Sequence, residues 1–436
     1  MVVSALLLAA SHAPLQGASV FVDASKVVAH VPEKMFGANL LQEKDVPLDN
    51  AYLAKIKHLG VTLLRYPGGF VEREEFYDWR YSDYNATDYA KFQKGQIDKA
   101  ALIAGGSERT GIGAFLAFTK RANVEPSLIV STLRFARDPK KGVAEAAAMV
   151  RAVNIEKKYG DYFVKIWEVG NERYEDVEGY AKEAKEYVRA MKAVDPRIQV
   201  FVMGGKRNRP EDAISMRPHL RNERFDGIVI HTFVVKNPQE VEQEIKAIRS
   251  GWGTDKTVFM SAWNSGSPKG LSGLEQGEEM IFIMDGFLRA GATMAAVWPV
   301  QNHTENTLTN IRGSAIYPAG ETFAWMSTYG KGGDYVETKT SGIFAGSYVQ
   351  GERLTIFFCG GNLPTRPVSL DVRGFRFDPG VVETEAMYAS GSTSAREAPR
   401  FRKVQPVLSG DKITFNINES SRHEVIRLTL TRSGVR

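Results

Sequence analysis

The sequence predicts an α/β fold, a (β/α)8 TIM barrel followed by a C-terminal antiparallel β-sandwich, and two patterns lead to this prediction. From residue 36 to residue 331, short apolar segments alternate with amphipathic ones. Strict alternation of strands and helices is typical of a parallel sheet, and eight such units indicate a sheet that closes into a barrel. After residue 331 the helical pattern stops, and short apolar runs separated by turn residues are typical of a sandwich.

The eight strand–helix units can be assigned in order along the chain. The first helix places Tyr52, Leu53, Ile56 and Leu59 on one face and stops at Gly60, as expected of an amphipathic helix with a C-terminal glycine. The expected strands are 35–40, 61–69, 126–133, 162–169, 198–205, 226–233, 256–263 and 294–300. The expected helices are 52–59, 111–123, 142–160, 180–191, 210–221, 238–249, 275–292 and 320–330.

A doubly wound open sheet is the structural alternative. That fold usually carries a glycine-rich nucleotide loop, but neither GxGxxG nor GxxxxGK[ST] follows any of the expected strands. The closed barrel is therefore the preferred prediction. In the C-terminal part, strands are expected at 335–349, 353–361, 366–375, 381–390, 412–418 and 424–431.

Four segments follow from these patterns. Residues 1–18 contain a short apolar stretch and then small residues, which is typical of a secretory signal peptide, although no basic residues precede the apolar stretch. From this we expect a secreted or periplasmic protein. Residues 19–35 have strand character and are expected to add strands to the sandwich. Residues 36–331 are expected to form the barrel and residues 332–436 the sandwich.

Composition excludes several classes of protein. The 56 basic and 51 acidic residues give a mild net charge of +5 that is spread along the chain, so no nucleic-acid partner is expected. No apolar run reaches the roughly 18 residues that cross a bilayer, so no membrane insertion is expected.

The single cysteine, Cys359, lies in an apolar run and is expected in a core. The seven histidines form no HxH or HExxH pair, so neither a metal nor a cofactor is expected. The sequence does not define an oligomeric state.

The expected strand ends combine carboxylate, amide, arginine and aromatic side chains. In a (β/α)8 barrel the active site lies at the C-terminal ends of the strands. Apolar faces of sugars stack on aromatic rings, while sugar hydroxyls bond to amides and guanidinium groups. We therefore expect a carbohydrate substrate. The candidate site residues are Arg65, Arg134, Asn171, Glu172, His231, Phe233, Ala262, Trp263, Asn264, Trp298 and Gln301.

Several short motifs resemble one group of enzymes. WEVGNE, residues 167–172, resembles the acid/base segment of the retaining glycoside hydrolases of clan A, in which Asn-Glu ends the fourth strand and a nucleophilic glutamate ends the seventh. LLRYPGG (63–69), FYDW (76–79) and DGIVIHTF (226–233) are most similar to the α-L-arabinofuranosidases of glycoside hydrolase family 51 and its neighbours. The resemblance implies a retaining glycosidase acting on a cell-wall or algal glycan, with an α-L-arabinofuranoside as the first expected substrate.

The resemblance also implies roles for single residues. Glu172 would be the general acid/base, and Asn171 would hold the 2-hydroxyl of the sugar. Arg65 would brace the floor of the site, His231 would line it, and Trp298 would form an aromatic platform. Purely structural roles are the alternatives: a helix-start carboxylate for Glu172, an ion pair inside the barrel for Arg65, a buried histidine for His231 and core packing for Trp298.

Two positions depart from the family pattern. The relatives usually have a tyrosine on the sixth strand that contacts the nucleophile, where this chain has Phe233. At the seventh strand the family pattern is Glu-Trp, and this chain has Ala262-Trp263. A retaining glycosidase needs two carboxyl groups, one of which attacks the anomeric carbon, and a methyl group has no lone pair for this attack. We therefore expect the chain as given to be close to inactive.

Three explanations of Ala262 remain open. The favoured one is replacement of a nucleophilic glutamate that leaves the rest of the site in place. The others are a natural sugar-binding pseudoenzyme and a nucleophile from another loop, with Glu305 as the nearest candidate.

The predicted arabinofuranoside substrate also has an alternative. The loop 204–224 is rich in arginine, and Arg73, Arg134 and Arg173 are expected near the same face, so a uronic or sulfated glycan would fit unless neighbouring acids neutralise these groups.

Overall fold

The structure is a computed structural model of the 436-residue chain. It describes residues 17–42, 45, 47–69, 78–81, 88, 91–92, 94–104, 109–233, 238–253, 256–265, 273–302, 306–311, 314–389, 396–410 and 412–434. The expected signal peptide falls almost entirely outside these residues, as do Arg73 and the alternative nucleophile Glu305. Among the described residues, no helix is long and apolar enough to cross a membrane.

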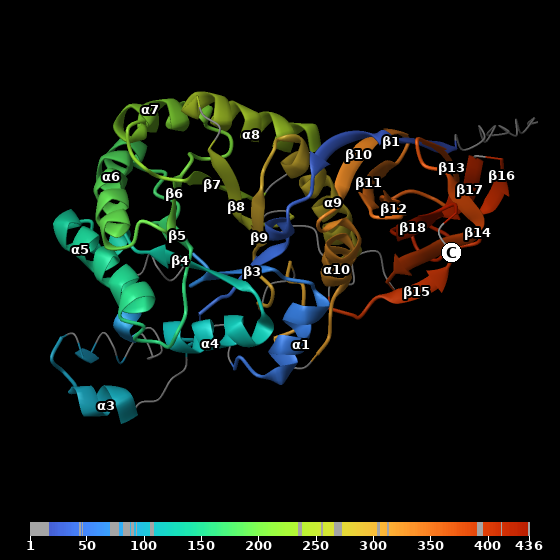
Figure 1. Cartoon of the computed structure of the whole chain (residues 1–436). Helices are drawn as coiled ribbons and strands as arrows, with labels where there is room; N and C mark the ends of the chain where they lie inside the picture. Colours follow the sequence, from blue (N-terminus) through green and yellow to red (C-terminus); the bar gives the residue numbers. More distant parts are fainter. Residues whose placement is uncertain are drawn as a thin grey trace, which may run out of the picture.

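Eight parallel strands form a closed barrel in sequence order, which confirms the predicted fold class (Figure 1). The first and last strands pair with each other and close it, with Gly37 beside Ala296. The barrel strands are β2 (Gly37–Asn39), β3 (Leu63–Tyr66), β4 (Glu125–Val130), β5 (Ile166–Val169), β6 (Gln199–Met203), β7 (Gly227–Thr232), β8 (Thr257–Trp263) and β9 (Met294–Val297).

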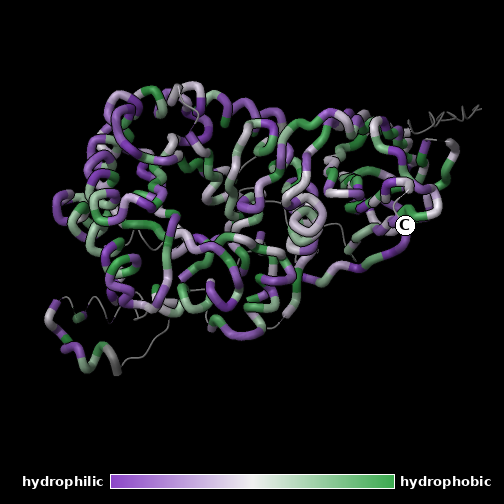
Figure 2. The backbone as a smooth tube through the Cα atoms, viewed as in Figure 1, coloured by the Kyte–Doolittle hydropathy of each residue, from purple (hydrophilic) through white to green (hydrophobic). Residues whose placement is uncertain are grey.

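Amphipathic helices follow the strands and cover the outside of the barrel. Helix α6 shows why: the Asp176 side chain accepts a hydrogen bond from the Gly179 backbone and starts the helix, and Tyr180, Tyr187 and Met191 face the sheet and are buried. Figure 2 shows the resulting hydrophilic outer surface of these helices. They are α1 (Asn50–His58), α4 (Ile112–Ala122), α5 (Pro139–Val150), α6 (Val177–Val194), α7 (Pro210–Leu220), α8 (Pro238–Trp252), α9 (Gly273–Arg289) and α10 (Pro318–Gly330). A short extra helix, α3 (Lys99–Ala104), lies in the long connection between β3 and α4.

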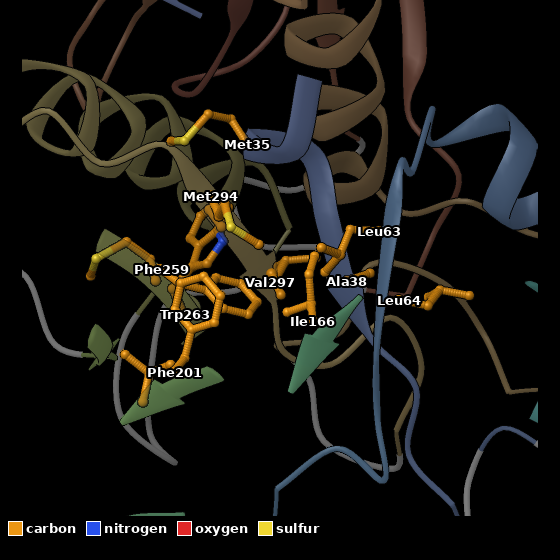
Figure 3. Close-up of a cluster of buried hydrophobic side chains, with 14 of the residues drawn as sticks. Met35, Ala38, Leu63, Leu64, Ile166, Phe201, Phe259, Trp263, Met294 and Val297 are labelled. Atoms are coloured by element: carbon orange, nitrogen blue, oxygen red, sulfur yellow. The ribbon is translucent and has the colours of Figure 1, made fainter. Parts of the chain in front are cut away.

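Apolar side chains from many strands gather in one buried cluster, part of which is drawn in Figure 3. Phe201 of β6 and Phe259 of β8 meet edge to face, with ring centroids 5.8 Å apart. Ile166 of β5 and Leu63 of β3 belong to the same cluster. Burial of this apolar surface supplies most of the free energy that holds the barrel together, so the polar side chains at the strand ends stand on a rigid base.

The remaining strands form a second sheet with its own core. Its order is β15-β14-β18-β12-β11-β10-β1-β13-β17-β16. The strands are β1 (Ala18–His30), β10 (Asp334–Ser341), β11 (Phe344–Gln350), β12 (Arg353–Cys359), β13 (Arg366–Arg373), β14 (Phe377–Tyr388), β15 (Arg400–Lys403), β16 (Val407–Ser409), β17 (Lys412–Ile417) and β18 (Val425–Arg432). The N-terminal strand β1 thus lies inside the C-terminal sheet. It pairs antiparallel with β10 but parallel with β13, so this sheet is mixed, whereas the sequence predicted a purely antiparallel one.

Helices α9 and α10 join the barrel to this second sheet (Figure 1). The ring of Phe282 on α9 packs edge to face on Phe344 of β11, with centroids 4.4 Å apart. On the same helix, the Glu278 carboxylate contacts the His423 ring at 3.0 Å. Because apolar and charged contacts both cross this boundary, the two parts form one packed unit.

Candidate active site

The candidate site lies at the carboxyl ends of the barrel strands, where the predicted residues of β3, β5, β7, β8 and β9 converge. Arg65 of β3 is fully buried and forms a two-pronged ion pair with Glu168 of β5, with N–O distances of 2.8 and 2.9 Å. The same guanidinium group donates to the side-chain oxygens of Asn39, at 2.9 Å, and Asn171, at 3.0 Å. Arg65 therefore braces the floor of the site, and its burial excludes direct contact with a ligand.

This bracing orients Asn171. A guanidinium group only donates, so the atom of the Asn171 amide that faces Arg65 must be its oxygen. The amide nitrogen then points away from Arg65. Asn171 is 7% exposed and lies at the barrel mouth, so its N–H groups are presented where a sugar hydroxyl could accept them.

The loop after β3 passes close above this network. Gly69 has a φ of +89°, and a Cβ added there would lie 2.8 Å from both Arg65 Nη1 and Asn171 Oδ1. Only glycine combines this backbone conformation with such a close approach. The second glycine of RYPGG is thus explained by the arginine network beneath it.

We expect Gly69→Ala to lower the free energy of unfolding by about 1–3 kcal/mol, since the new methyl group is strained and displaces Arg65 or Asn171. Gly332→Ala is the matched control, because Gly332 also has a positive φ, +72°, but nothing lies within 4 Å of its would-be Cβ. Urea denaturation of both variants measures the difference. Equal losses would show that backbone conformation alone, and not contact with the network, requires glycine at position 69.

The end of β5 presents Glu172 by means of an unusual backbone. Gly170 has a φ of +70°, and its Cβ would lie 2.6 Å from the Thr132 hydroxyl. Glu172 itself has a φ of +51°, the left-handed region that non-glycine residues rarely adopt. Such strained residues are frequent at functional sites, where the surrounding structure holds them in place. The Glu172 side chain is 32% exposed, so it is open to a ligand.

His231 connects Glu172 with strand β8. Its Nδ1 lies 2.8 Å from Glu172 Oε1, and its Nε2 lies 3.1 Å from Ser261 Oγ. In the register of β7 and β8, His231 lies directly beside Ala262. His231 therefore contacts the predicted acid/base directly and lies on the strand next to the predicted nucleophile position, at the same end of the barrel.

Two half-buried aromatic rings continue from His231 along the barrel mouth. The Phe233 ring meets the His231 ring edge to face, with centroids 6.3 Å apart, and meets the Trp298 ring in the same way at 5.8 Å. Together they form an aromatic wall next to the carboxylate, a surface on which the apolar face of a sugar can stack. Phe233 and Trp298 directly follow β7 and β9, and their contact with a substrate stays a prediction.

Two predicted substrate contacts on β8 are instead parts of the protein interior. Trp263 is fully buried and belongs to the apolar cluster drawn in Figure 3. Its ring packs on Phe287 of α9 and Phe323 of α10, with ring centroids 5.5 and 6.4 Å away. Asn264 is also fully buried, and its amide nitrogen donates to the backbone oxygens of Trp298 and residue 306, both at 2.7 Å. Asn264 therefore fixes the loop that carries Trp298, and neither side chain is available to a ligand.

Gln301 is likewise buried, which corrects the prediction that it binds substrate. Its Oε1 accepts a hydrogen bond from Lys55 Nζ at 3.0 Å.

Asp45 is a buried carboxyl group in the loop after β2. It lies close to the side chains of Gln301, Lys55 and Tyr52, and its Oδ2 accepts a hydrogen bond from the Leu41 backbone N–H at 2.5 Å. Burial raises the pKa of Asp45 to about 8, although hydrogen bonds and the Lys55 charge oppose the shift.

This buried carboxyl predicts a pH dependence of stability. Between the pKa of the unfolded chain, near 3.8, and about 8, the folded protein holds a proton on Asp45 that the unfolded chain has lost. The free energy of unfolding should therefore fall as pH rises through this window, by at most about 1.4 kcal/mol per pH unit. We expect Asp45→Asn to flatten the fall between pH 5 and pH 8 in urea titrations. Glu279, whose pKa burial raises to about 7, contributes a smaller fall that the variant should keep.

Arg134 lies farther out, after β4. Its guanidinium group pairs with Asp78 at 3.1 Å and packs over the Phe135 ring at 5.2 Å. The ion pair ties Asp78, the third residue of the FYDW motif, to the segment that follows β4. Within the described ranges, no group of three or more His, Cys, Asp or Glu side chains is arranged to hold a metal ion.

Asn39, Glu168 and Ser261 belong to the site network but were not among the predicted site residues. All three are fully buried. Their sequence signal is weak: each is a polar residue near the end of an apolar strand. Asn39 bonds to the backbone of β8 and β9 as well as to Arg65, with its amide nitrogen 2.9 Å from the residue 261 carbonyl. It therefore ties the two ends of the closed barrel together beneath the site.

Comparison with solved structures shows that this fold is shared with glycoside hydrolases. The fold is shared with the α-L-arabinofuranosidase of Thermotoga maritima, solved as an arabinose complex, at a TM-score of 0.71 and 16% identity over 95% of this chain and 100% of that one. It is shared with a family 51 α-L-arabinofuranosidase of Bifidobacterium longum at a TM-score of 0.70, 13% identity and the same coverage. A GH39 enzyme of Xanthomonas axonopodis follows at 0.63 and 13%, over 98% of this chain and 100% of that chain.

Sequence comparison points to the same group. The chain is 25% identical over 215 residues to an intracellular exo-α-(1→5)-L-arabinofuranosidase of Streptomyces lividans. That match covers 44% of this chain and 30% of the relative, so the chain matches less than a third of the relative's length. No protein-family profile matches the chain. The predicted resemblance to the family 51 arabinofuranosidases and their clan is confirmed at the level of fold.

Proposed function

We propose that the barrel mouth is the glycoside-binding site of a retaining α-L-arabinofuranosidase from which the attacking carboxylate is missing. This proposal rests on the position of His231. Its ring contacts Glu172, and its backbone lies beside Ala262 in the register of β7 and β8, so Glu172 and Ala262 lie at the same end of the barrel. The chain as given then binds a terminal arabinofuranoside and turns it over extremely slowly.

Each residue has a defined task in this proposal. Glu172 donates a proton to the leaving oxygen, and its exposed carboxyl group is the one positioned to reach it. His231, held from its other nitrogen by Ser261, fixes the orientation of that carboxyl group. Asn171, held by Arg65, donates to the 2-hydroxyl of the sugar. Phe233 and Trp298 stack against the sugar, and the Ala262 methyl group leaves open the face of the anomeric carbon opposite the leaving group.

A neutral furanoside is favoured over a uronic or sulfated glycan at this site, because three of the arginines that motivated the anionic alternative pair with carboxylates. Arg207 pairs with Glu244 at 2.9 Å, and Arg209 pairs with Asp212 at 2.7 Å. Arg173, next to the proposed acid/base, pairs with Glu183 at 3.3 Å. A guanidinium group engaged in this way has less charge to offer an anionic sugar.

The test uses small anions as substitutes for the missing carboxylate. With an aryl α-L-arabinofuranoside, azide or formate should raise turnover of the chain at least about tenfold, because the anion can attack from the side of Ala262. Azide should give the glycosyl azide of inverted configuration, which NMR identifies. Calorimetry should also show binding of arabinofuranosyl oligosaccharides but not of xylo-oligosaccharides. Equal binding of both, or an azide product of retained configuration, would refute the proposed site.

A further inference from the structure

A second hollow surface lies far from the barrel mouth, in the C-terminal sheet. It is a cavity of about 990 Å³ formed by β1, the ends of β13 and β18, the turn after β13 and the start of β14. Figure 1 shows β1 and β13 in the part of the molecule that lies beyond α9 and α10. The volume is at the upper end of the range for small-molecule sites, so the cavity can hold several linked units of a ligand.

A bulge in β14 creates this cavity. Phe377 pairs with Arg432 of β18, but the next pair is Val382 with Leu430, so four residues of β14 are looped out of the ladder. On the other side, the turn at Gly374 packs tightly on β1: its φ is +75°, and a Cβ there would lie 2.8 Å from the Ser25 nitrogen. Bulges of this kind re-aim side chains and are retained for that purpose.

Aromatic rings line the cavity. Phe375 is buried and belongs to the core of the second sheet, while Phe21 and Phe377 are half-buried and present part of their rings to solvent. The Arg432 guanidinium group lies 5.0 Å from the centre of the Phe375 ring. Partly exposed rings beside cationic groups suit the apolar faces of sugar rings that carry negative substituents.

Two further arginines line the cavity. Arg373 and Arg376 are exposed, and within the described part of the chain neither forms an ion pair, although Arg373 interacts electrostatically with Asp23. Arg432 is bound to Glu352 at 3.0 Å. Among the described residues that line the cavity, Asp371 is the acidic one. The lining therefore has an excess of positive charge.

We propose that this cavity is a second carbohydrate site, which binds a glycan chain carrying carboxylate or sulfate groups. The planar guanidinium groups of Arg373 and Arg376 bind these anions in bidentate fashion, and the neighbouring phenylalanines stack on the sugar rings. The site anchors an acidic polysaccharide to the C-terminal sheet while the barrel mouth contacts a side chain of the polymer. Binding at this cavity does not require hydrolysis at the barrel mouth, so the two proposals can be tested independently.

The experiment measures binding by calorimetry with the full chain and three oligosaccharide probes: an oligogalacturonate, a sulfated galacto-oligosaccharide and a neutral galacto-oligosaccharide. We expect at least one anionic probe to bind and the neutral probe not to bind. The double variant Arg373→Gln with Arg376→Gln should weaken this binding at least about tenfold, equivalent to about 1.4 kcal/mol. The two anionic probes distinguish carboxylate from sulfate as the recognised group.

A control of equal net charge is available on the edge strand β15, which pairs with the C-terminal end of β14, at residues 385–388, and not with the start of β14 that lines the cavity. Arg400 and Lys403 are exposed on β15, so Arg400→Gln with Lys403→Gln removes the same charge from residues that do not line the cavity. This control, and Phe233→Ala at the barrel mouth, should leave the affinity unchanged. Equal losses in both double variants would attribute binding to overall charge and overturn the proposal. Binding of the neutral probe, or tighter binding of a DNA oligonucleotide at this cavity, would overturn it as well.

Discussion

Ala262→Glu should give a retaining glycosidase that turns over aryl α-L-arabinofuranosides faster than the chain as given, by on the order of 10³-fold or more. The reason is geometric. Ala262 lies beside His231, which binds Glu172, so a carboxylate at 262 joins an acid/base that is already in place. It supplies the oxygen that attacks the anomeric carbon and balances the positive charge of the transition state. Initial rates, together with NMR of the first-formed anomer, measure gain and stereochemistry.

The matched control is Ala262→Gln, which adds the same volume without a charge and should stay inactive. Adding Glu172→Gln to the glutamate variant should abolish hydrolysis of substrates with poor leaving groups and spare activated aryl substrates, as loss of a proton donor does. A folded glutamate variant that binds arabinofuranosides but hydrolyses none of a broad glycan panel would identify the chain as a carbohydrate-binding protein. A wild-type chain with full activity would instead direct attention to Glu305.

Arg65→Leu should lower the free energy of unfolding by about 3–5 kcal/mol, because it leaves the Glu168 carboxylate buried without its partner. Asn39 and Asn171 lose a hydrogen bond in the same step. All six tryptophans lie between residues 79 and 325, so their fluorescence in urea reports on the barrel. The variant should also lose affinity for arabinofuranosides, since Asn171 is no longer oriented.

Two companion variants separate the pair from other effects. Arg65→Leu combined with Glu168→Leu should recover most of the stability, because no unpaired charge remains in the barrel. This double variant should still bind arabinofuranosides poorly, because no guanidinium group orients the Asn171 amide. Arg400→Leu, on the exposed edge strand β15, should change stability by less than about 0.5 kcal/mol. A loss below about 1 kcal/mol for Arg65→Leu alone would show that water or another group satisfies Glu168.

Much of the architecture could be predicted from local patterns. Each barrel strand and each of its flanking helices appears near the expected residues, because apolar periodicity is set by neighbours along the chain. The short strands β15 and β16 were missed, since a run of three or four residues has too few positions to show an alternation. The parallel pairing of β1 with β13 was also missed, because nothing local to β1 specifies its partner.

WEVGNE predicted Glu172 and Asn171 as site residues, and the strand-end argument predicted His231, Phe233 and Trp298. The structure places all five in or just after barrel strands, and their roles stay predictions. Trp263 and Asn264 were predicted to face the substrate but are buried in the protein interior. An irregularity in β8 explains the difference for Trp263. The register of β7 and β8 shifts between Val229 and His231, so β8 gains a residue there. This irregularity places Ala262 beside His231 and turns Trp263 towards α9 and α10.

The sequence by itself determined the alternation of strands and helices, the residues that end each strand, and the alanine at position 262, where the motif resemblance predicts a nucleophilic glutamate. The tertiary structure decided which of those side chains meet. Arg65 and Glu168 are 103 residues apart, and His231 and Ser261 are 30 apart. Such pairs depend on the register between strands, and a single extra residue in one strand reverses the direction of the side chains that follow. Local periodicity does not record that shift, so the folded barrel alone defines the partners.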